Sequence, residues 1–350
     1  MVNVRTLAAS LAFTSFLGTT VAHPGESPEE AKREILSHKA AQALGRRALS
    51  SCASSQNAAA LKARSAARRA ATAQALRQKR GLTEKPLKTK RDQAGFAKWS
   101  AVSHDSTSLG YDLETDLDTI FTSNSTCTLV PEVTIGPYWV GGELIRADVT
   151  DGQTGIPLHL DLQFIDLNSC AAIPSDTLID IWACNATGVY SGVSSQGQGG
   201  LNTTHGRGIQ STDADGVVQF DTILPGWYTG RTPHIHVMTT SGATLLENDT
   251  YVSTSGTPSH IGQFFFDQDL ILETGDYEPY STNQQRLTLN SADGIGISEA
   301  TVDYDPFVDY VRLGDDLNDG LLGWITVFVD TTANQSSNRQ VSPTKSSIPK

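Results

Sequence analysis

The distribution of apolar and polar residues changes in character near residue 126. Before this point, residues 29–49 and 58–76 are rich in Ala, Arg, Lys and Gln and contain few large apolar side chains. This composition favours helix. Because the Ala-rich faces bury little apolar surface, these helices need a packing partner to be stable. We therefore predict a basic helical segment at residues 23–98.

From residue 126 onward the spacing is that of β-strands. Residues 158–164 alternate apolar and polar side chains, and shorter strand candidates follow at residues 177–182, 217–220, 234–238 and 286–289. Asp and Gly mark turns at residues 151–152, 213–216 and 293–294. The pattern predicts an all-β fold, a two-sheet β-sandwich at residues 99–330. A polar tail at residues 331–350 is expected to be disordered.

Charge divides the chain at the same place. Residues 23–100 contain 17 Lys and Arg against 6 Asp and Glu, a balance of +11. Residues 101–350 contain 8 Lys and Arg against 32 Asp and Glu, a balance of -24. Such a division indicates two parts, and the acidic part does not suit a nucleic-acid surface.

The first 22 residues have the features of a signal peptide. A basic start is followed by a short apolar stretch and by small residues before His23. The apolar stretch is too short to span a membrane, so we expect a secreted, extracellular protein with no membrane segment after cleavage. Five glycosylation sequons agree with export, although some of them need not be modified: Asn124, Asn185, Asn202, Asn248 and Asn334.

Four cysteines permit two disulfide bonds in an exported chain. We expect Cys170 to bond to Cys184, because the two flank a short turn and a strand. Cys52 would then bond to Cys127 and fasten the basic segment to the acidic domain. Other pairings remain possible.

Two dibasic pairs interrupt the basic segment, Lys79-Arg80 and Lys90-Arg91. They are either processing sites that release a propeptide or ordinary solvated basic residues, and the sequence favours neither.

The strongest candidate for chemistry is the sequence Pro233-His234-Ile235-His236. Residues i and i+2 of a strand point to the same face, and two neighbouring imidazoles suit a metal ion. Two tyrosines precede this pair in a fixed order. The full pattern reads W-x5-G-x-Y ending at Tyr190, then P-G-x-Y ending at Tyr228, then R-x-P-H-I-H.

In this ordered set the chain resembles the intradiol ring-cleavage dioxygenases, which include catechol and protocatechuate dioxygenases, and it looks closest to a secreted fungal branch. The resemblance covers about residues 127–328 and includes Gly136-Pro137-Tyr138-Trp139. It implies one non-haem Fe(III) held by four ligands, Tyr190, Tyr228, His234 and His236. It further implies a pocket arginine at Arg231, a pocket glutamine at Gln263, and a substrate contact at Tyr138.

The residue types agree with this chemistry. Phenolate oxygens are hard donors that favour Fe(III) over Fe(II). The resemblance implies that O2 is inserted between the two hydroxyl-bearing carbons of a catechol to give a cis,cis-muconate. Tyr228 would help to accept substrate protons, and Arg231 would stabilise charge that develops on the ring.

The sequence leaves the substrate and the oligomeric state open. Neutral catechols, such as catechol or hydroxyquinol, are expected to react better than protocatechuate. The reason is that the sandwich region offers few residues to bind a substrate carboxylate: besides Arg231, only Arg146, Arg207, Arg286 and Arg312.

Three other functions are compatible with the sequence. One is a non-catalytic secreted β-sandwich that binds aromatics or carbohydrate. Another is a secreted copper oxygenase with His23 at its mature N-terminus, although the sequence identifies no second histidine for such a site. The third is a structural cell-wall protein.

Overall fold

The computed structural model describes residues 52, 55–82, 103–105, 135–300 and 305–337. Several predicted features lie outside these residues. They are the signal peptide at residues 1–22, the helix at residues 29–49, the Lys90-Arg91 pair, Cys127 and Asn124.

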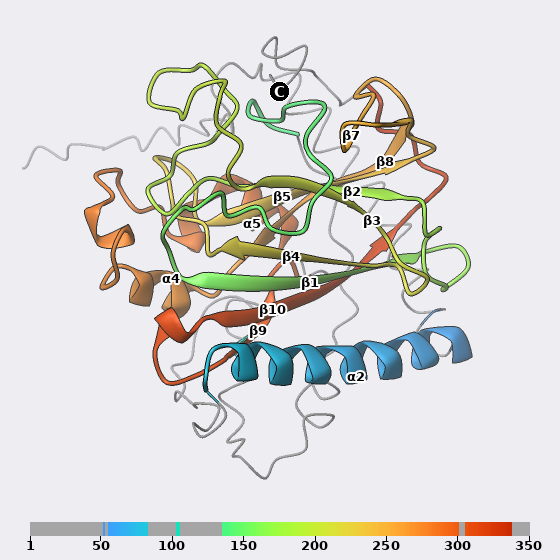
Figure 1. The fold of residues 1–350 in the computed structure, drawn as a ribbon, viewed down its shortest axis with the longest axis horizontal. Helices are drawn as coiled ribbons and strands as arrows, with labels where there is room; N and C mark the ends of the chain where they lie inside the picture. Colours follow the sequence, from blue (N-terminus) through green and yellow to red (C-terminus); the bar gives the residue numbers. More distant parts are fainter. Residues whose placement is uncertain (1–51, 53–54, 83–102, 106–134, 301–304, 338–350) are drawn as a thin grey trace, which may run out of the picture.

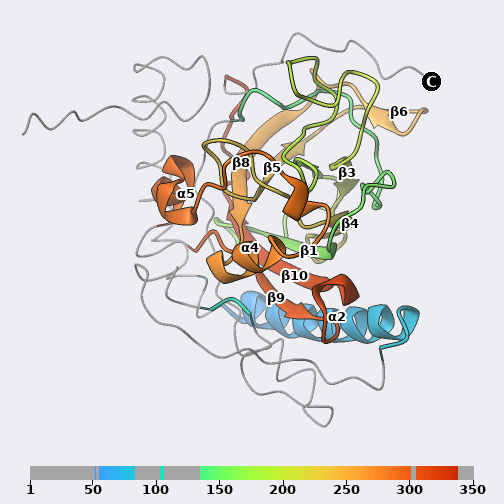
Figure 2. The same ribbon diagram turned by 90° about the vertical axis from the view of Figure 1, so that its left-hand side faces the viewer.

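Two four-stranded sheets face each other and form a β-sandwich (Figures 1 and 2). The first sheet has the strand order β4-β1-β10-β9, and the second has the order β3-β2-β5-β8. β1 and β10 are parallel, whereas the other pairs within these two sheets are antiparallel. The strands are β1 (Pro157–Asp166), β2 (Leu178–Trp182), β3 (Arg207–Ser211), β4 (Val217–Ile223), β5 (His234–Ser241), β8 (Thr257–Phe265), β9 (Asp309–Arg312) and β10 (Leu321–Val329).

The remaining elements are short and lie around the sandwich. A two-stranded hairpin of β6 and β7 connects β5 to β8. These elements are β6 (Leu245–Leu246), β7 (Thr250–Tyr251), α4 (Gln268–Thr274), η2 (Tyr280–Thr282), η3 (Asn290–Ala292), α5 (Gly294–Glu299) and η4 (Leu317–Asp319). None of the described helices has the length and apolar character needed to cross a bilayer.

The predicted two-sheet sandwich is therefore confirmed, and four of the five strand candidates are confirmed as β1, β2, β4 and β5. The fifth, at residues 286–289, is wrong because this segment has no strand partner in the described structure. The segment and its neighbour Gln285 instead contact the loop after β4. The indole Nε1 of Trp227 donates to Gln285 O over 2.9 Å, and Gly230 N donates to Thr288 Oγ1 over 3.1 Å.

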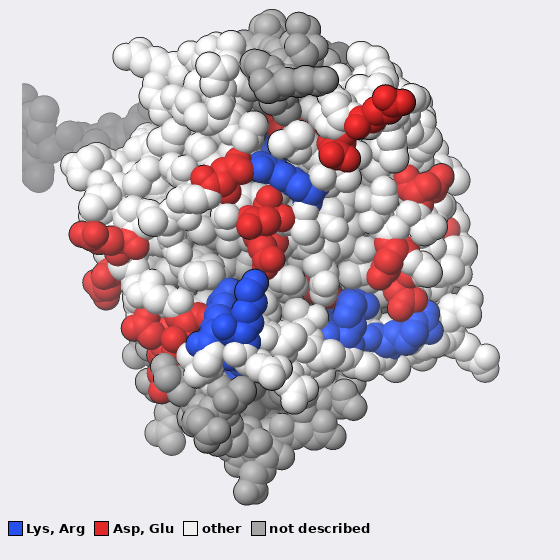
Figure 3. All heavy atoms as spheres, in the orientation of Figure 1, with Lys and Arg blue, Asp and Glu red and all other residues white. Residues whose placement is uncertain are grey.

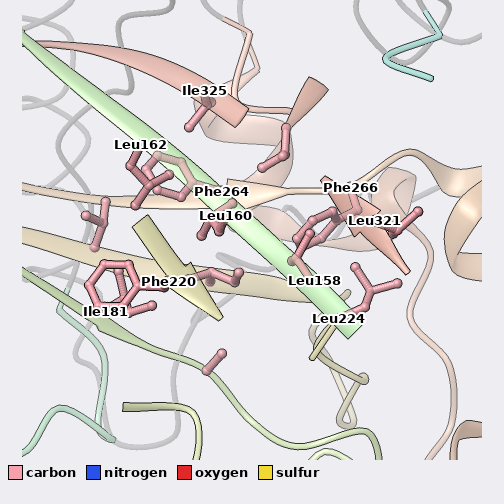
Figure 4. Packing of buried hydrophobic residues seen from close by; sticks show 14 of the residues in the cluster. Leu158, Leu160, Leu162, Ile181, Phe220, Leu224, Phe264, Phe266, Leu321 and Ile325 are labelled. Carbon is pink, nitrogen blue, oxygen red and sulfur yellow. The ribbon is translucent and has the colours of Figure 1, made fainter. Parts of the chain in front are cut away.

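The hydrophobic core lies between the two sheets (Figure 4). Leu158, Leu160 and Leu162 of β1 are at most 1% exposed and belong to this core, together with Phe220 of β4 and Phe264 of β8. The alternating residues of β1 point to the outer face of the sheet, as the period of a strand requires. That outer face is covered by a helix.

The covering helix is α2 (Gln56–Lys79), which lies across the β4-β1-β10-β9 sheet (Figures 1 and 2). Its small apolar residues pack on Val311, Leu313, Leu322 and Trp324, which belong to β9, β10 and the turn between them. The helix predicted at residues 58–76 is thus confirmed, and it packs on the sheet, as expected of a helix with an Ala-rich face.

Charged and polar side chains fix the orientation of α2 on the sheet. Asp161 of β1 is fully buried and accepts hydrogen bonds from the guanidinium groups of Arg68 and Arg69, and Ser65 Oγ donates to Gln163 Oε1 over 2.7 Å. On the face drawn in Figure 3, most basic side chains lie at the level of α2 with acidic side chains beside them. The opposite charges of the two parts of the chain are therefore used in their contact.

The predicted disulfide pairing is wrong. Cys170 is bonded to Cys52, with Cα atoms 5.3 Å apart, and Cys184 is a buried free thiol. Cys170 lies in the turn after β1, whereas Cys184 lies beyond the far end of β2. The five residues of β2 alone span about 17 Å, and Cys184 lies past the end of that strand. The bond to Cys52 fastens the N-terminal end of α2 to the sandwich, as was expected of the second pair.

The predicted start of the disordered tail is also wrong. Thr331 Oγ1 donates to Asp166 Oδ1 over 2.9 Å, and Gln335 N donates to Pro258 O over 2.7 Å. Residues 331–337 therefore pack on the sandwich, and the rest of the tail lies outside the described residues.

Candidate metal centre

Two histidines project from the same face of β5. His234 and His236 are at most 1% exposed, and their ring centroids are 4.9 Å apart. The Nδ1 of His234 lies 2.6 Å from Thr232 O, which can only accept a hydrogen bond. Nδ1 therefore carries the proton, and the lone pair of Nε2 is left to bind a metal. This Nε2 faces Tyr190 Oη at 3.2 Å. His236 stacks on Trp182 with a centroid distance of 4.8 Å, which fixes the plane of its ring.

Two loops carry the tyrosines to these histidines. Tyr190 lies in the loop after β2, and Tyr228 lies in the loop between β4 and β5. The loops are in direct backbone contact, because Gly226 N donates to Asn185 O over 3.1 Å. Tyr190 is fully buried, whereas Tyr228 is half-buried and so is the more accessible phenol.

A glycine two residues before each tyrosine permits this contact. A Cβ on Gly188 would collide with the carbonyl oxygen of Trp227, and a Cβ on Gly226 would collide with that of Ala186. Gly188 also has φ +76°, which glycine adopts without strain. The two G-x-Y sequences therefore identify the points at which the loops touch, and each places its tyrosine beside the other.

The four predicted ligands come together in one cluster. The ring centroid of Tyr228 lies 5.7 Å from those of Tyr190 and His234, and the centroid of Tyr190 lies 6.4 Å from that of His236. Within the described part of the chain, no group of three or more His, Cys, Asp or Glu could hold a metal ion. A metal here would thus depend on the two phenol oxygens as well as the two imidazoles, a donor set that suits a hard trivalent cation.

Burial raises the pKa of both phenols. The positive charge of Arg231 lowers the pKa of Tyr190 and of Tyr228, but the effect of burial is larger. Without a cation, both phenols stay protonated at neutral pH. A coordinated trivalent cation stabilises a phenolate strongly and would reverse this. The residues present therefore fit a ferric ion.

A buried arginine and glutamine lie beside the cluster. Arg231 is 3% exposed and follows Tyr228 by one tight turn, in which Arg231 N donates to Tyr228 O over 2.9 Å. One of its Nη atoms donates to Oε1 of Gln263, the residue directly opposite His236 on β8. Arg231 Nη1 and Gln263 Nε2 have no hydrogen-bond partner among the described residues, so both donors are available to a ligand.

Asp293 binds the other side of this arginine. Arg231 Nε donates to Asp293 Oδ2 over 2.9 Å, and the carboxylate is 0% exposed. Burial opposes both charges, but the pairing outweighs it: the pKa of Arg231 is raised and that of Asp293 is lowered. Sequence reasoning treated Asp293 only as a turn residue. The signal that could have identified it is an Asp before a short helix, the usual N-cap residue.

Tyr138 covers the two tyrosines from one side. Its ring is half-buried and lies 4.7 Å from the ring of Tyr190 and 6.3 Å from that of Tyr228. Arg207 holds this segment, because its Nη2 donates to Tyr138 O over 2.6 Å and to Ser191 O over 2.7 Å. This structural role of Arg207 was not foreseen from the sequence.

The free Cys184 lies between the two tyrosine loops. Its Sγ donates to Gly226 O over 3.4 Å, and burial raises the pKa of the thiol to about 12. The thiol is thus protonated, and its hydrogen bond is made to the backbone of the Tyr228 loop.

The described sequons differ in accessibility. Asn185 is half-buried, and its Nδ2 donates to Gln153 Oε1 over 3.0 Å. The others are exposed: Asn202, Asn248 and Asn334.

Comparison with known proteins places these residues in a family context. Residues 140–304 match the family model described as Dioxygenase. No curated protein matches the chain significantly by sequence. Among solved structures, an intradiol ring-cleavage dioxygenase from Tetranychus urticae is 27% identical, with 59% of this chain and 97% of that chain covered and a TM-score of 0.48.

Two bacterial structures are more distant. Catechol 1,2-dioxygenase from an Acinetobacter species is 19% identical, with 63% of this chain and 68% of that chain covered and a TM-score of 0.37. Hydroxyquinol 1,2-dioxygenase from Pseudomonas putida is 14% identical, with 62% and 71% covered and a TM-score of 0.37. The segment that carries Tyr190, Tyr228, His234 and His236 is thus similar to the Dioxygenase family.

Proposed function

We propose that this protein is a secreted non-haem Fe(III) dioxygenase that cleaves catechols between the two hydroxyl-bearing carbons. Both atoms of O2 enter the product, so catechol and O2 give a cis,cis-muconate without an external reductant. The observation that carries the proposal is the convergence of two phenols and two imidazoles beside a buried arginine. The match of residues 140–304 to the Dioxygenase family model supports it.

Tyr190, Tyr228, His234 and His236 would hold the ferric ion. The ion would supply Lewis-acid chemistry, which makes a bound catecholate reactive toward O2. The two tyrosines have different roles. Tyr190 is fully buried and serves as a fixed donor. Tyr228 is the more accessible phenol, so its Oη is placed to take up a proton from an entering catechol.

Arg231 and Gln263 stabilise the negative charge that develops on the substrate. Each has a buried donor without a protein partner among the described residues, Nη1 and Nε2 respectively. Donors fixed in a dry site stabilise such charge without having to reorganise during the reaction. Tyr138 borders the site next to both tyrosines, where a catechol ring can pack against it.

Neutral catechols fit the charges around the site better than acidic ones. The guanidinium of Arg231 is paired with Asp293, Arg207 is buried against backbone carbonyls, and Arg312 is paired with Glu273. These three guanidinium groups are therefore already paired with carboxylates or carbonyls of the protein. A substrate carboxylate would lack a strong partner, which favours catechol or hydroxyquinol over protocatechuate.

The proposal also includes export of the protein and retention of α2 after export. The Cys52–Cys170 disulfide supports an oxidising compartment. The processing of Lys79-Arg80 is disfavoured, since Arg80 Nη1 donates to Asp319 O over 2.5 Å and Arg77 Nη1 donates to Leu313 O over 2.6 Å. We infer that α2 is a lasting part of the folded domain and not part of a released propeptide.

Purified protein tests this function directly. Iron analysis, a visible spectrum and oxygen uptake with catechol should give about one iron per chain, a burgundy-red tyrosinate band and a muconate product. Iron-loaded protein without a visible band would contradict the tyrosine ligands. A yellow semialdehyde product would mean cleavage outside the two hydroxyls, and iron-free protein that only binds aromatics would favour a non-catalytic sandwich.

Variants separate metal binding from catalysis. Tyr228→Phe should shift or weaken the visible band, and His236→Ala should lower the iron content. Arg231→Ala should keep iron and colour but lose most turnover, because its role is in the transition state. Tyr251→Phe is the matched control, since Tyr251 is a buried tyrosine in β7 outside the cluster. A spectrum of Tyr251→Phe that changed as much as that of Tyr228→Phe would contradict the assignment.

A further inference from the structure

We propose that Asp293 is a positioning residue that orients two parts of the centre at once, the side chain of Arg231 and the imidazole of His234. The consequence for catalysis rests on the function proposed above. The orientation of His234 does not, because it concerns hydrogen bonds within the protein.

One carboxylate oxygen of Asp293 makes both connections. Oδ2 accepts from Arg231 Nε over 2.9 Å and from the backbone N of Thr232 over 2.9 Å. Thr232 O in turn accepts from His234 Nδ1 over 2.6 Å. A single residue, Thr232, thus links the carboxylate to the ring, and its carbonyl determines which nitrogen of His234 carries the proton.

The other carboxylate oxygen holds Asp293 itself in place. Oδ1 accepts from the backbone N of Ile295 and of Gly296, each over 3.0 Å, and so caps the first turn of α5. The carboxylate is 0% exposed. The start of α5 therefore fixes the position of this carboxylate, independently of Arg231. A carboxylate that is fixed in this way can orient the arginine that binds to it.

Arg231 is held in a way that leaves one donor for a ligand. Its Nε is directed to Asp293, and another donor is directed to Gln263 Oε1, while Nη1 has no partner among the described residues. Without Asp293 the guanidinium would lose its only charged partner among the described groups that contact it. We expect it to rotate, so that Nη1 would no longer be directed to one place.

Asp293→Asn tests this with little change in shape. Asn and Ser both cap helices well, so Asp293→Asn and Asp293→Ser keep the start of α5 but remove the charge that binds Arg231. The first readout uses iron-free protein and nitrogen NMR of the imidazoles, at one pH where they are neutral. Wild type should show His234 protonated on Nδ1, and both variants should show a mixture of tautomers. His159, whose Nδ1 lies 2.8 Å from Asp221, serves as the internal control that should not change.

The second readout is steady-state kinetics of iron-loaded protein. Asp293→Asn should lower kcat by roughly 10- to 100-fold, the usual effect of removing a group that orients a metal site, with iron content unchanged. In a background of Arg231→Gln, the same change should lower kcat much less than it does in the wild type, because only its effect through His234 remains. Asp215→Asn is the control for loss of an arginine-paired carboxylate outside the site and should leave kcat unchanged.

The outcomes distinguish the two proposals. Wild-type kcat in Asp293→Asn, or an equal loss of kcat with and without Arg231, would overturn the role of Asp293 toward Arg231. An unchanged tautomer of His234 in both variants would overturn its role toward the histidine. Wild-type protein that binds no iron and cleaves no catechol would refute the proposed function, and the NMR result would still decide the role toward His234.

Discussion

Replacing Asp161 by Asn should destabilise the domain strongly at neutral pH and less strongly at pH 3. Asp161 is 0% exposed and lies under α2. Both of its oxygens accept from Arg68, over 2.8 and 2.9 Å, and Oδ1 also accepts from Arg69 Nε over 3.0 Å. The substitution would leave two guanidinium groups without a counter-charge, and Arg69 is itself 1% exposed.

The magnitude follows from the pKa of the carboxyl. Burial opposes the charge of Asp161, but the two arginines outweigh burial and lower the pKa from 3.8 to about 2. This difference corresponds to about 2 kcal/mol of unfolding free energy. Because the pKa is lowered in the folded state, this stability is present above pH 4 and is lost as the pH falls from about 4 to 2. Removing one partner of a buried ion pair costs more, about 3–5 kcal/mol, since the remaining charges stay buried.

Urea unfolding at pH 7, 5 and 3 would measure the effect, with Asp215→Asn as the matched control. Asp215 pairs with Arg64 of the same helix, but that pair is largely exposed and should contribute little. The difference between wild type and Asp161→Asn should be large at pH 7 and should shrink below pH 4. Equal losses for the two variants, or a difference that does not depend on pH, would refute the reasoning.

Three further predictions concern the rest of the chain. Cys52→Ser should lower the unfolding free energy by about 5 kcal/mol in the chain-entropy model, because the bond to Cys170 closes a loop with a sequence separation of 118; non-reducing peptide mapping that links Cys170 elsewhere would contradict it. Mass spectrometry of protein secreted from a eukaryotic host should find no glycan on Asn185, whose Nδ2 is engaged, while the accessible acceptors are Asn202, Asn248 and Asn334. An oxygen-electrode screen should show faster turnover of catechol than of protocatechuate; the reverse preference would point to the exposed Arg286, whose loop packs beside the Tyr228 turn, and Arg286→Ala should then abolish it.

Local patterns predicted much of the fold. The alternation in β1 was sufficient to assign both its core-facing leucines and its outer face, because the period of a strand is independent of its partners. The segment at residues 286–289 also alternates, but it lies beside the Tyr228 loop, where turns and side chains satisfy the neighbouring backbone groups. A four-residue pattern contains no information about such a competing partner.

The site shows the same division between local and distant information. His234 and His236 were assignable because their spacing alone places them on one face, and the glycines at 188 and 226 accompany the two tyrosines in the sequence. Asp293 follows Arg231 by about 60 residues, and nothing near it in the sequence indicates the arginine. The predicted partner of Cys170 was wrong for the same reason. The prediction relied on closeness along the chain, whereas the bond to Cys52 depends on how the whole chain folds.

The parallel pairing of β1 with β10 has a consequence for the order of folding. β10 is the last strand of the described chain, yet it lies between β1 and β9 in the sheet, and α2 packs on its outer face. During synthesis, α2 and β1 therefore emerge long before the strand that completes their environment. Such non-local contacts give a high contact order and slow folding. We expect that the nascent chain exposes the Ala-rich face of α2 and one edge of β1 until β10 has been synthesised, which makes early folding dependent on protection from aggregation.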